Sequence, residues 1–394
     1  MDEADNPFVP GAGTPPPLLV GRDKLVHTAE IALSRAKNGR HGKSFVAVGL
    51  RGVGKTVVLN KVRRHAEDNG FQVVYIEAQA EESLVALLAP QLRSILININ
   101  RLSAAGDLAD KALGSLRNFA NALKISIGEI GIEFDFASVA GQADSGNLAN
   151  DLPELFVAVG KAAAEANTAV VILVDEIQYL PDPEISALVM AIHRVNQYGL
   201  PTVMIGAGLP QILGKMGDAK SYAERLFDFP RVEALSRENS HKAIAEPARE
   251  QDVVFLEPAL DAIFALTEGY PYFLQEWAFV AWNAAEQSPI GLDVIDAAKP
   301  EAIRRLDESF FRVRLERMTP RERQYMLAMA QLGPGPHASG DIAKQFGASV
   351  QSVAPTRSNL IGKGMLYSPS HGSTDFTVPL FDEFLRREMA DADK

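Results

Sequence analysis

The sequence of 394 residues contains no cysteine. Disulfide bonds and zinc sites made of cysteine thiolates are therefore excluded, and a reducing compartment such as the cytoplasm is the expected location. No apolar run approaches the roughly 20 residues that span a bilayer, so we expect no membrane segment. The N-terminus, residues 1–5, is acidic, whereas targeting segments for secretion or organelles begin with basic residues.

Metal-ligand patterns and a strong positive charge are also lacking. The seven histidines are scattered, and no two have the spacing of metal ligands. The net charge of −11 argues against nonspecific nucleic-acid binding by the whole surface, although one local basic patch is compatible with it. The hydrophobic share of 47% is that of an ordinary globular protein. The length predicts about two or three domains.

A glycine-rich motif near the start of the chain matches a P-loop, in which a glycine is separated by four residues from Gly-Lys-Thr. Its residues are Gly49, Leu50, Arg51, Gly52, Val53, Gly54, Lys55 and Thr56. The apolar residues 45–48 before it predict a buried strand, and residues 56–67 after it predict a helix. Strand, loop and helix are the setting that a P-loop requires.

The chemistry of this motif is phosphate binding. Glycines allow the backbone to curl so that its N–H groups, with the dipole of the following helix, point at phosphate oxygens. Lys55 would reach the β- and γ-phosphates, and the Thr56 hydroxyl would be a magnesium ligand. We therefore predict that the motif, with Val57 directly after it, binds ATP or ADP together with Mg²⁺.

A second motif consists of the apolar residues 170–174 followed by Asp175 and Glu176. Such a run predicts a parallel strand that is buried on both faces, and ligands bind at the carboxyl ends of such strands. Asp175 would hold magnesium directly or through water, and Glu176 would orient and deprotonate the attacking water. The alternative is that the two acids cap the following turn. Gln178 is a further residue that we expect to face this site.

The segment between the two motifs is longer than one strand–helix–strand step, so we predict an insertion at about residues 84–150. Residues 84–102 and 107–123 read as helices, and alternating apolar residues predict a strand within 125–136. Residues 141–150 are small and polar and predict a loop. The insertion either contacts a partner or closes over the surface of its own domain. A Pro- and Gly-rich stretch, up to about residue 20, predicts an extended segment over a surface.

Further strands and an arginine complete the first part of the chain. Residues 72–77 and 201–208 read as strands, and the second of these ends in the glycines Gly206 and Gly208. Arg225 stands where it could reach the nucleotide of a neighbouring subunit as an arginine finger. The competing interpretation is a local salt bridge with Glu224 or Asp228.

After residue 235 the alternation of strands and helices ends. Residues 236–317 read as helical, with Gly269, Tyr270 and Pro271 at a turn between two helices. The last part, residues 318–394, opens with Thr319, Pro320 and Glu322 in the pattern of a capped helix start. Helices at 340–346 and 349–361 and a two-stranded ribbon at 364–368 and 375–378 predict a winged helix.

Taken together, these motifs resemble the AAA+/STAND type of P-loop ATPase, which is related to the origin-recognition-like ATPases. Gly21 and Arg22 resemble the entry motif of the family, which lies against the adenine. Tyr270 and Pro271 resemble the Gly-x-Pro turn of STAND proteins, whose proline packs on the base. The chain departs from AAA+ initiators, since no sensor arginine follows Gly269 and no polar sensor ends the strand at 201–208.

The resemblance implies a fold and a domain order. We expect an α/β P-loop NTPase domain at residues 1–235, with a parallel sheet and helices on both faces. A helical lid domain at residues 236–317 and a winged-helix domain at residues 318–394 would follow it. In STAND-like proteins a winged helix can fold back and lock the ADP state.

The predicted function is an ATP-binding and slowly ATP-hydrolysing switch, whose nucleotide state controls homo-oligomerisation or the engagement of a protein partner. The alternative is an ATP-regulated DNA-binding initiator or transcription regulator that acts through the winged helix. The residues that would face DNA are Gln351, Arg357, Ser358, Asn359 and Lys363. A weaker third hypothesis is a nucleotide-binding scaffold with negligible hydrolysis.

Overall fold

The computed structural model describes the chain except residues 12, 80–81, 103–105, 124–141 and 393–394. The described chain divides into two compact units. The sheet unit comprises Asp23–Val48 and Val58–Arg231, and the helical unit comprises Met1–Arg22, Gly49–Val57 and Val232–Lys394. The strand predicted within residues 125–136 lies outside the described residues. In the described part of the chain, no helix is long and apolar enough to cross a bilayer.

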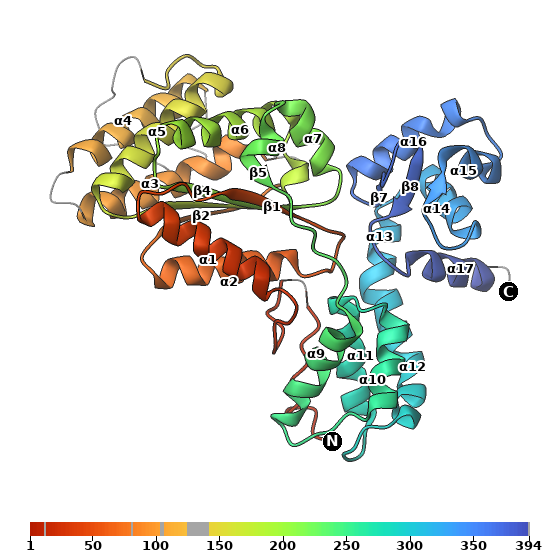
Figure 1. Ribbon diagram of the computed structural model, residues 1–394. Helices are drawn as coiled ribbons and strands as arrows, with labels where there is room; N and C mark the ends of the chain where they lie inside the picture. The colour runs from red at the N-terminus through yellow and green to blue at the C-terminus, as the bar shows by residue number, and fades with distance from the viewer. Residues whose placement is uncertain (12, 80–81, 103–105, 124–141, 393–394) are drawn as a thin grey trace. The chain divides into compact units, whose positions relative to one another are not determined.

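The sheet unit is built on a parallel sheet of five strands, counted over the described residues, in the order β2-β3-β4-β1-β5 (Figure 1). The strands are β1 (Ser44–Val48), β2 (Gln72–Glu77), β3 (Val170–Asp175), β4 (Thr202–Gly208) and β5 (Phe227–Asp228). The central strands β1, β3 and β4 are buried along their whole length, which explains why most of their residues are apolar. Parallel pairing brings the carboxyl ends of β1, β3 and β4 to one edge of the sheet.

Helices cover both faces of this sheet (Figure 1). On one face lie α1 (Asp23–Lys37) and α2 (Lys55–Asp68). On the other face lie α3 (Leu84–Leu102), α5 (Leu148–Glu165) and α6 (Asp182–Gln197), and α4 (Asp107–Ala122) packs outside them. The short helices α7 (Ile212–Ala219) and α8 (Ala223–Leu226) follow β4. The predicted α/β P-loop NTPase fold with helices on both faces is therefore confirmed.

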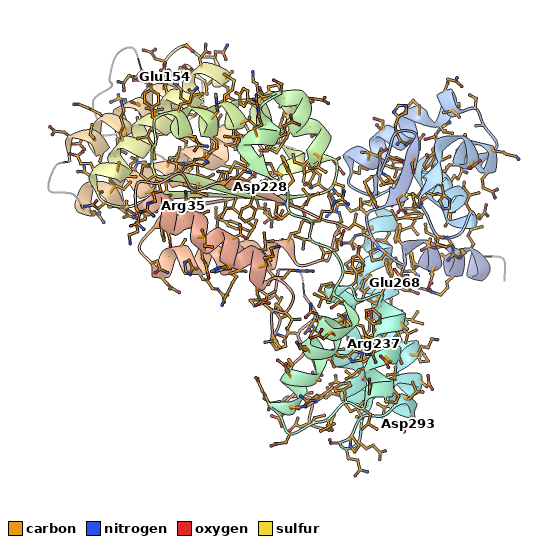
Figure 2. All side chains as sticks on the ribbon, in the orientation of Figure 1. Arg35, Glu154, Asp228, Arg237, Glu268 and Asp293 are labelled. Carbon is orange, nitrogen blue, oxygen red and sulfur yellow. The ribbon has the colours of Figure 1, made fainter. Side chains whose placement is uncertain are left out.

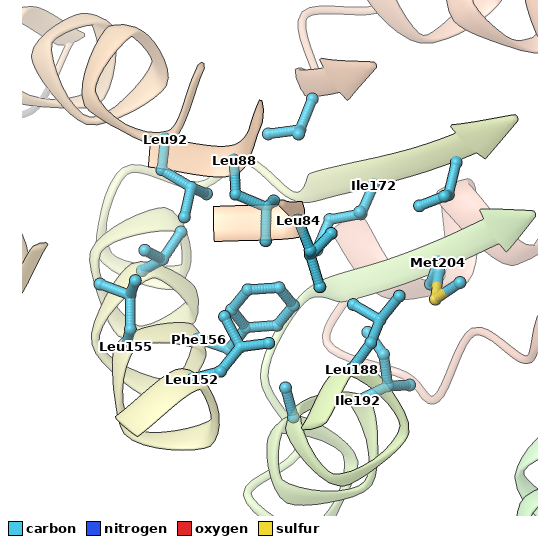
Figure 3. Packing of buried hydrophobic residues seen from close by; sticks show 14 of the residues in the cluster. Leu84, Leu88, Leu92, Leu152, Leu155, Phe156, Ile172, Leu188, Ile192 and Met204 are labelled. Carbon is cyan, nitrogen blue, oxygen red and sulfur yellow. The ribbon is translucent and has the colours of Figure 1, made fainter. Parts of the chain in front are cut away.

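The core between the sheet and α3, α5 and α6 is continuous (Figure 3). Leu84, Leu88 and Leu92 recur every fourth residue along α3, so one face of that helix is apolar and turns inward. Phe156 of α5 and Met204 of β4 meet them in the same cluster. Burial of these side chains stabilises the sheet at whose edge the second acidic motif lies.

The loop predicted at residues 141–150 ends earlier in the structure than we expected. Helix α5 already begins at Leu148, where the Asn147 side chain accepts a hydrogen bond of 3.0 Å from the Ala149 backbone N–H. An asparagine at this position caps a helix start, because its oxygen satisfies an N–H group that has no partner in the helix. Composition alone did not reveal that this polar residue is a cap.

In the helical unit, the chain after residue 236 first forms a set of packed helices. These are α9 (Arg237–Arg249), α10 (Glu257–Thr267), α11 (Pro271–Ala284), α12 (Leu292–Leu306), the π-helical turn η2 (Asp307–Phe311) and α13 (Arg312–Glu316). They match the helical stretch predicted from residue 236 to about 317. The N-terminal segment packs on them through Phe8, whose ring lies 6.1 Å from that of Phe255 and 6.4 Å from that of Trp282.

The C-terminal region contains α14 (Pro320–Gln331), β6 (His337–Ala338), α15 (Ser339–Phe346), α16 (Val350–Gly362), β7 (Leu366–Tyr367), β8 (Ser373–Phe376) and α17 (Phe381–Ala392). We call it the C-terminal domain. The predicted cap is confirmed, since the Thr319 hydroxyl accepts from the Glu322 N–H and the Glu322 carboxylate accepts from the Thr319 N–H. The predicted two-stranded ribbon was incomplete, because β6 adds a third strand in the order β6-β8-β7 among the described residues. Pro355 lies inside α16.

Candidate functional site

The glycine-rich motif forms a tight loop between β1 and α2. Gly52 has φ 81° and Gly54 has φ 91°, and a side chain at either position would be strained in this left-handed backbone. Gly49 is required for another reason, because a Cβ atom there would lie 2.1 Å from the Val232 carbonyl oxygen. The chain then enters α2 at Lys55. The backbone therefore has the strand–loop–helix form that binds phosphate.

Lys55 is directed into the loop. Its side chain is 6% exposed, and its ammonium donates hydrogen bonds to the carbonyls of Gly49 at 3.0 Å and Leu50 at 2.8 Å. A cation held inside the loop in this way lies where phosphate oxygens would replace the carbonyls as its partners. Thr56 follows in the first turn of α2 and is half-buried. The loop thus fits the phosphates of a nucleotide.

Arg22 fastens the loop to the rest of the helical unit. Its guanidinium donates to the Val53 carbonyl at 3.0 Å, to the Glu233 carbonyl, and to the Gly21 carbonyl at 3.2 Å. Burial lowers the pKa of Arg22, and Glu233 partly offsets this. Gly21 has φ 67°. The adenine contact expected of Gly21 and Arg22 remains a prediction, while their contact with the loop backbone is new.

The turn before α11 lies against the same loop. A Cβ atom at Gly52 would lie 3.6 Å from Tyr272 and 4.0 Å from the Tyr270 ring. Pro271 occupies the first turn of α11, as expected. Glu268, at the C-terminal end of α10 (Figure 2), and Gly269 both have a left-handed backbone conformation. Helix α10 therefore ends at two left-handed residues and not at the glycine alone.

The C-terminal domain also contacts the loop, which the sequence did not indicate. The Arg51 backbone N–H donates to the Thr377 carbonyl at 3.1 Å, and the Arg51 Nε donates to the Gly364 carbonyl at 3.2 Å. Thr377 is fully buried, and its hydroxyl donates to the same Gly364 carbonyl at 2.7 Å. No local pattern marks these partners, because they are distant in sequence and contact the loop through backbone carbonyls.

The second acidic motif ends β3 in the sheet unit. Asp175 is 1% exposed, and its Oδ1 accepts a hydrogen bond of 2.8 Å from the Glu176 backbone N–H. The Tyr75 hydroxyl on β2 is hydrogen-bonded to the Asp175 side chain. Burial raises the pKa of Tyr75, and the negative charges of Asp175 and Glu77 raise it further. Tyr75 was missed, since only the pairing of β2 with β3 brings it beside Asp175.

Glu176 has φ 50° and ψ 35°, a left-handed conformation that is uncommon outside glycine. Strain of this kind is found at functional sites. The Gln178 amide donates to Glu176 Oε2, and Gln178 is 4% exposed. Gln178 therefore faces Glu176.

Arg225 lies on α8 and is exposed. It makes no ion pair with any described residue, and Asp228, one of its two expected partners, is paired with Lys43. Its role as an arginine finger stays a prediction. Among the residues that the structure describes, no cluster of three or more His, Cys, Asp or Glu side chains could hold a metal. A magnesium ion of the P-loop kind needs no such cluster, because phosphates and water supply most of its ligands.

Comparison with known families agrees with this geometry. Residues 18–205 match the family described as AAA ATPase domain. Residues 308–385 match a second family, which is described as a domain of unknown function (DUF8462). Among curated proteins, none matches the chain in sequence.

Solved structures are similar to this chain at low sequence identity. The Walker-type ATPase of Pyrococcus abyssi has a TM-score of 0.59 and 15% identity, with 93% of this chain and 96% of that chain covered. The Orc1 protein of Aeropyrum pernix in complex with DNA has a TM-score of 0.47 and 16% identity, with 95% and 94% covered. Cdc6p of Pyrobaculum aerophilum has a TM-score of 0.48 and 13% identity, with 100% and 99% covered.

Proposed function

We propose that this chain is an AAA ATPase that acts as an ATP-hydrolysing switch of the STAND type, in which the nucleotide state controls the contact of the C-terminal domain with the P-loop. The observation that carries the proposal is the pair of hydrogen bonds from Arg51 to the carbonyls of Thr377 and Gly364. A loop that changes its ligands with the nucleotide is thereby connected to a domain that can present a surface to a partner.

The chemistry is assigned to the motif residues. The loop N–H groups and Lys55 would hold the phosphates, and Thr56 and Asp175 would hold magnesium, which would supply positive charge against the phosphates. Glu176 orients the water and accepts its proton. Strand β1, which precedes the loop in the chain, ends at the same sheet edge as β3, and ligands of parallel sheets bind at this edge.

Hydrolysis is tested with purified full-length protein and release of inorganic phosphate as the readout. Glu176→Gln should abolish turnover while binding of a fluorescent ATP analogue persists, and the exposed Glu165→Gln is the matched control. Lys55→Ala should abolish nucleotide binding, whereas the exposed Lys61→Ala on α2 should not. Full turnover by Glu176→Gln would remove that residue from its proposed role.

The switch is tested by mass measurement and electron microscopy with ADP and with a non-hydrolysable ATP analogue. We propose homo-oligomerisation in the ATP state, with Arg225 reaching the nucleotide of a neighbouring subunit. A ring or filament that forms only with the ATP analogue, and is lost in Arg225→Ala, would support this. A monomer in both states would restrict the switch to one chain and an unidentified protein partner.

DNA binding through α16 has less support. The Arg357 guanidinium donates to Thr374 Oγ1 at 2.6 Å and to Ser368 Oγ at 3.0 Å, and Lys363 donates to Glu322 at 2.7 Å. Both cations are therefore engaged inside the C-terminal domain. If this domain is a winged helix that reads DNA, affinity should fall with salt and drop in Arg357→Ala or Lys363→Ala. The absence of binding at low salt, with and without ATP, would eliminate this alternative.

A further inference from the structure

The end of β4 lacks a polar side chain, and another residue occupies the space that this leaves. A Cβ atom built on Gly208 would lie 2.9 Å from Gln178 Oε1 and 2.9 Å from the Ile177 side chain. Gly208 is part of β4, whereas Gln178 belongs to the short 3-10 helix η1 (Ile177–Tyr179) that follows Glu176. Glycine at position 208 is therefore what allows the Gln178 side chain to reach β4.

Gln178 is fixed at both ends of its amide. Its Oε1 accepts a buried hydrogen bond of 2.9 Å from the Leu209 backbone N–H, and its Nε2 donates to Glu176 Oε2. A backbone N–H can only donate and an ionised carboxylate can only accept, so these partners determine which end of the amide is oxygen and which is nitrogen. The amide bridges the end of β4 and the carboxylate of Glu176.

The backbone that carries Gln178 is also held. The Lys215 ammonium on α7 donates to the carbonyls of Gln178 at 3.0 Å and Leu180 at 3.2 Å. The side chain itself is 4% exposed. Because Gln178 is buried, makes two side-chain hydrogen bonds and is held at its main chain, its amide has little freedom to bind another partner. Glu176, in its left-handed conformation, is thus supported from one side by a fixed donor.

We propose that Gln178 is a positioning residue for hydrolysis, which sets the orientation of the Glu176 carboxylate and connects it to β4. This inference rests on the proposed function, since it requires that Glu176 orients the attacking water. The amide takes the place of a polar side chain at the end of β4, and Gly208 makes room for it. A small displacement of a catalytic group costs up to about 100-fold in rate, so loss of the bridge lowers turnover without weakening nucleotide binding.

The test separates kcat from binding in the full-length protein. Gln178→Leu removes both hydrogen bonds of the amide and should lower kcat for ATP about 10- to 100-fold, with KM and the Kd of a fluorescent ATP analogue within about two-fold of wild type. The exposed Gln197→Leu is the matched control. An unchanged or increased kcat in a folded Gln178→Leu protein would overturn the proposal.

A second variant probes the hydrogen bond itself. Gln178→Glu keeps the length of the side chain and an acceptor for the Leu209 N–H, but it replaces the donor to Glu176 with a like charge. We expect kcat to fall as in Gln178→Leu, with KM and the Kd of the ATP analogue within about two-fold of wild type. Wild-type kcat in this variant would contradict the positioning role.

Gly208→Ala approaches the same bridge from β4. Its Cβ would meet Gln178 Oε1 at 2.9 Å, so kcat should fall as in Gln178→Leu, whereas Gly214→Ala, with nothing within 4 Å, should have no effect. Failure of the inference is distinguishable from failure of the proposed function. If the wild type does not hydrolyse ATP, or Glu176→Gln still does, the function fails; if both behave as expected and Gln178→Leu keeps full kcat, only the inference fails.

Discussion

The contact between Arg51 and the C-terminal domain gives a prediction about how tightly ADP is held. Arg51→Ala removes the bond from Nε to the Gly364 carbonyl, while the backbone bond to Thr377 remains. Arg51 is half-buried, and a bond from a charged donor to a carbonyl in such a place contributes about 1–1.5 kcal/mol. If the C-terminal domain restrains the loop around its ligand, that loss corresponds to about a 5- to 10-fold shift.

The assay is stopped-flow release of a fluorescent ADP analogue chased with excess ADP. We expect the dissociation rate to rise about 5- to 10-fold in Arg51→Ala. Arg64→Ala, at an exposed position of α2, removes the same charge elsewhere and should leave the rate unchanged.

A direct effect of Arg51 on the nucleotide must be separated from one through the C-terminal domain. Thr377→Val removes the hydroxyl that donates to the Gly364 and Met365 carbonyls and so loosens the turn that Arg51 contacts. If the two residues act through one contact, their effects on the release rate should be coupled by about 0.5 kcal/mol or more. Additive effects, or an unchanged rate in Arg51→Ala, would refute the reasoning.

Three further predictions concern stability and pH. Phe8→Ala should lower the free energy of unfolding by about 3–5 kcal/mol in denaturant titration, whereas Val9→Ala, 50% exposed, should cost little. Gly49→Ala should destabilise the protein and abolish nucleotide binding, because its Cβ would lie 2.1 Å from the Val232 carbonyl oxygen. Burial raises the pKa of Glu268, and the nearby carboxylates of Glu383 and Asp382 raise it further. The native state therefore binds more protons than the unfolded state, and the free energy of unfolding falls as the pH rises past the pKa of the unfolded state. Glu268→Gln should therefore raise Tm at about pH 7.5 and not at about pH 4, and equal shifts at both would contradict this assignment.

Much of the sheet unit was predictable, because the signals are local. The apolar runs at β1 and β3 predicted buried strands, and residues 201–208 predicted the strand β4; the structure has all three within a residue or so of the expected bounds. The start of the helix after Thr319 was also predictable from the sequence, because a capping box involves only residues Thr319 to Glu322. The extra strand β6 was not, because a two-residue strand is too short for any periodicity.

The sequence by itself determined the P-loop, the two acids at the end of β3 and the turn at Pro271, because each depends on backbone conformations encoded within a few residues. Only the tertiary structure decided which groups support them. Tyr75 meets Asp175 because β2 pairs with β3, Gln178 reaches Leu209 because Gly208 leaves room, and Arg51 meets Thr377 in the helical unit. These partners are distant in the chain, and no local pattern states which surfaces meet when it folds.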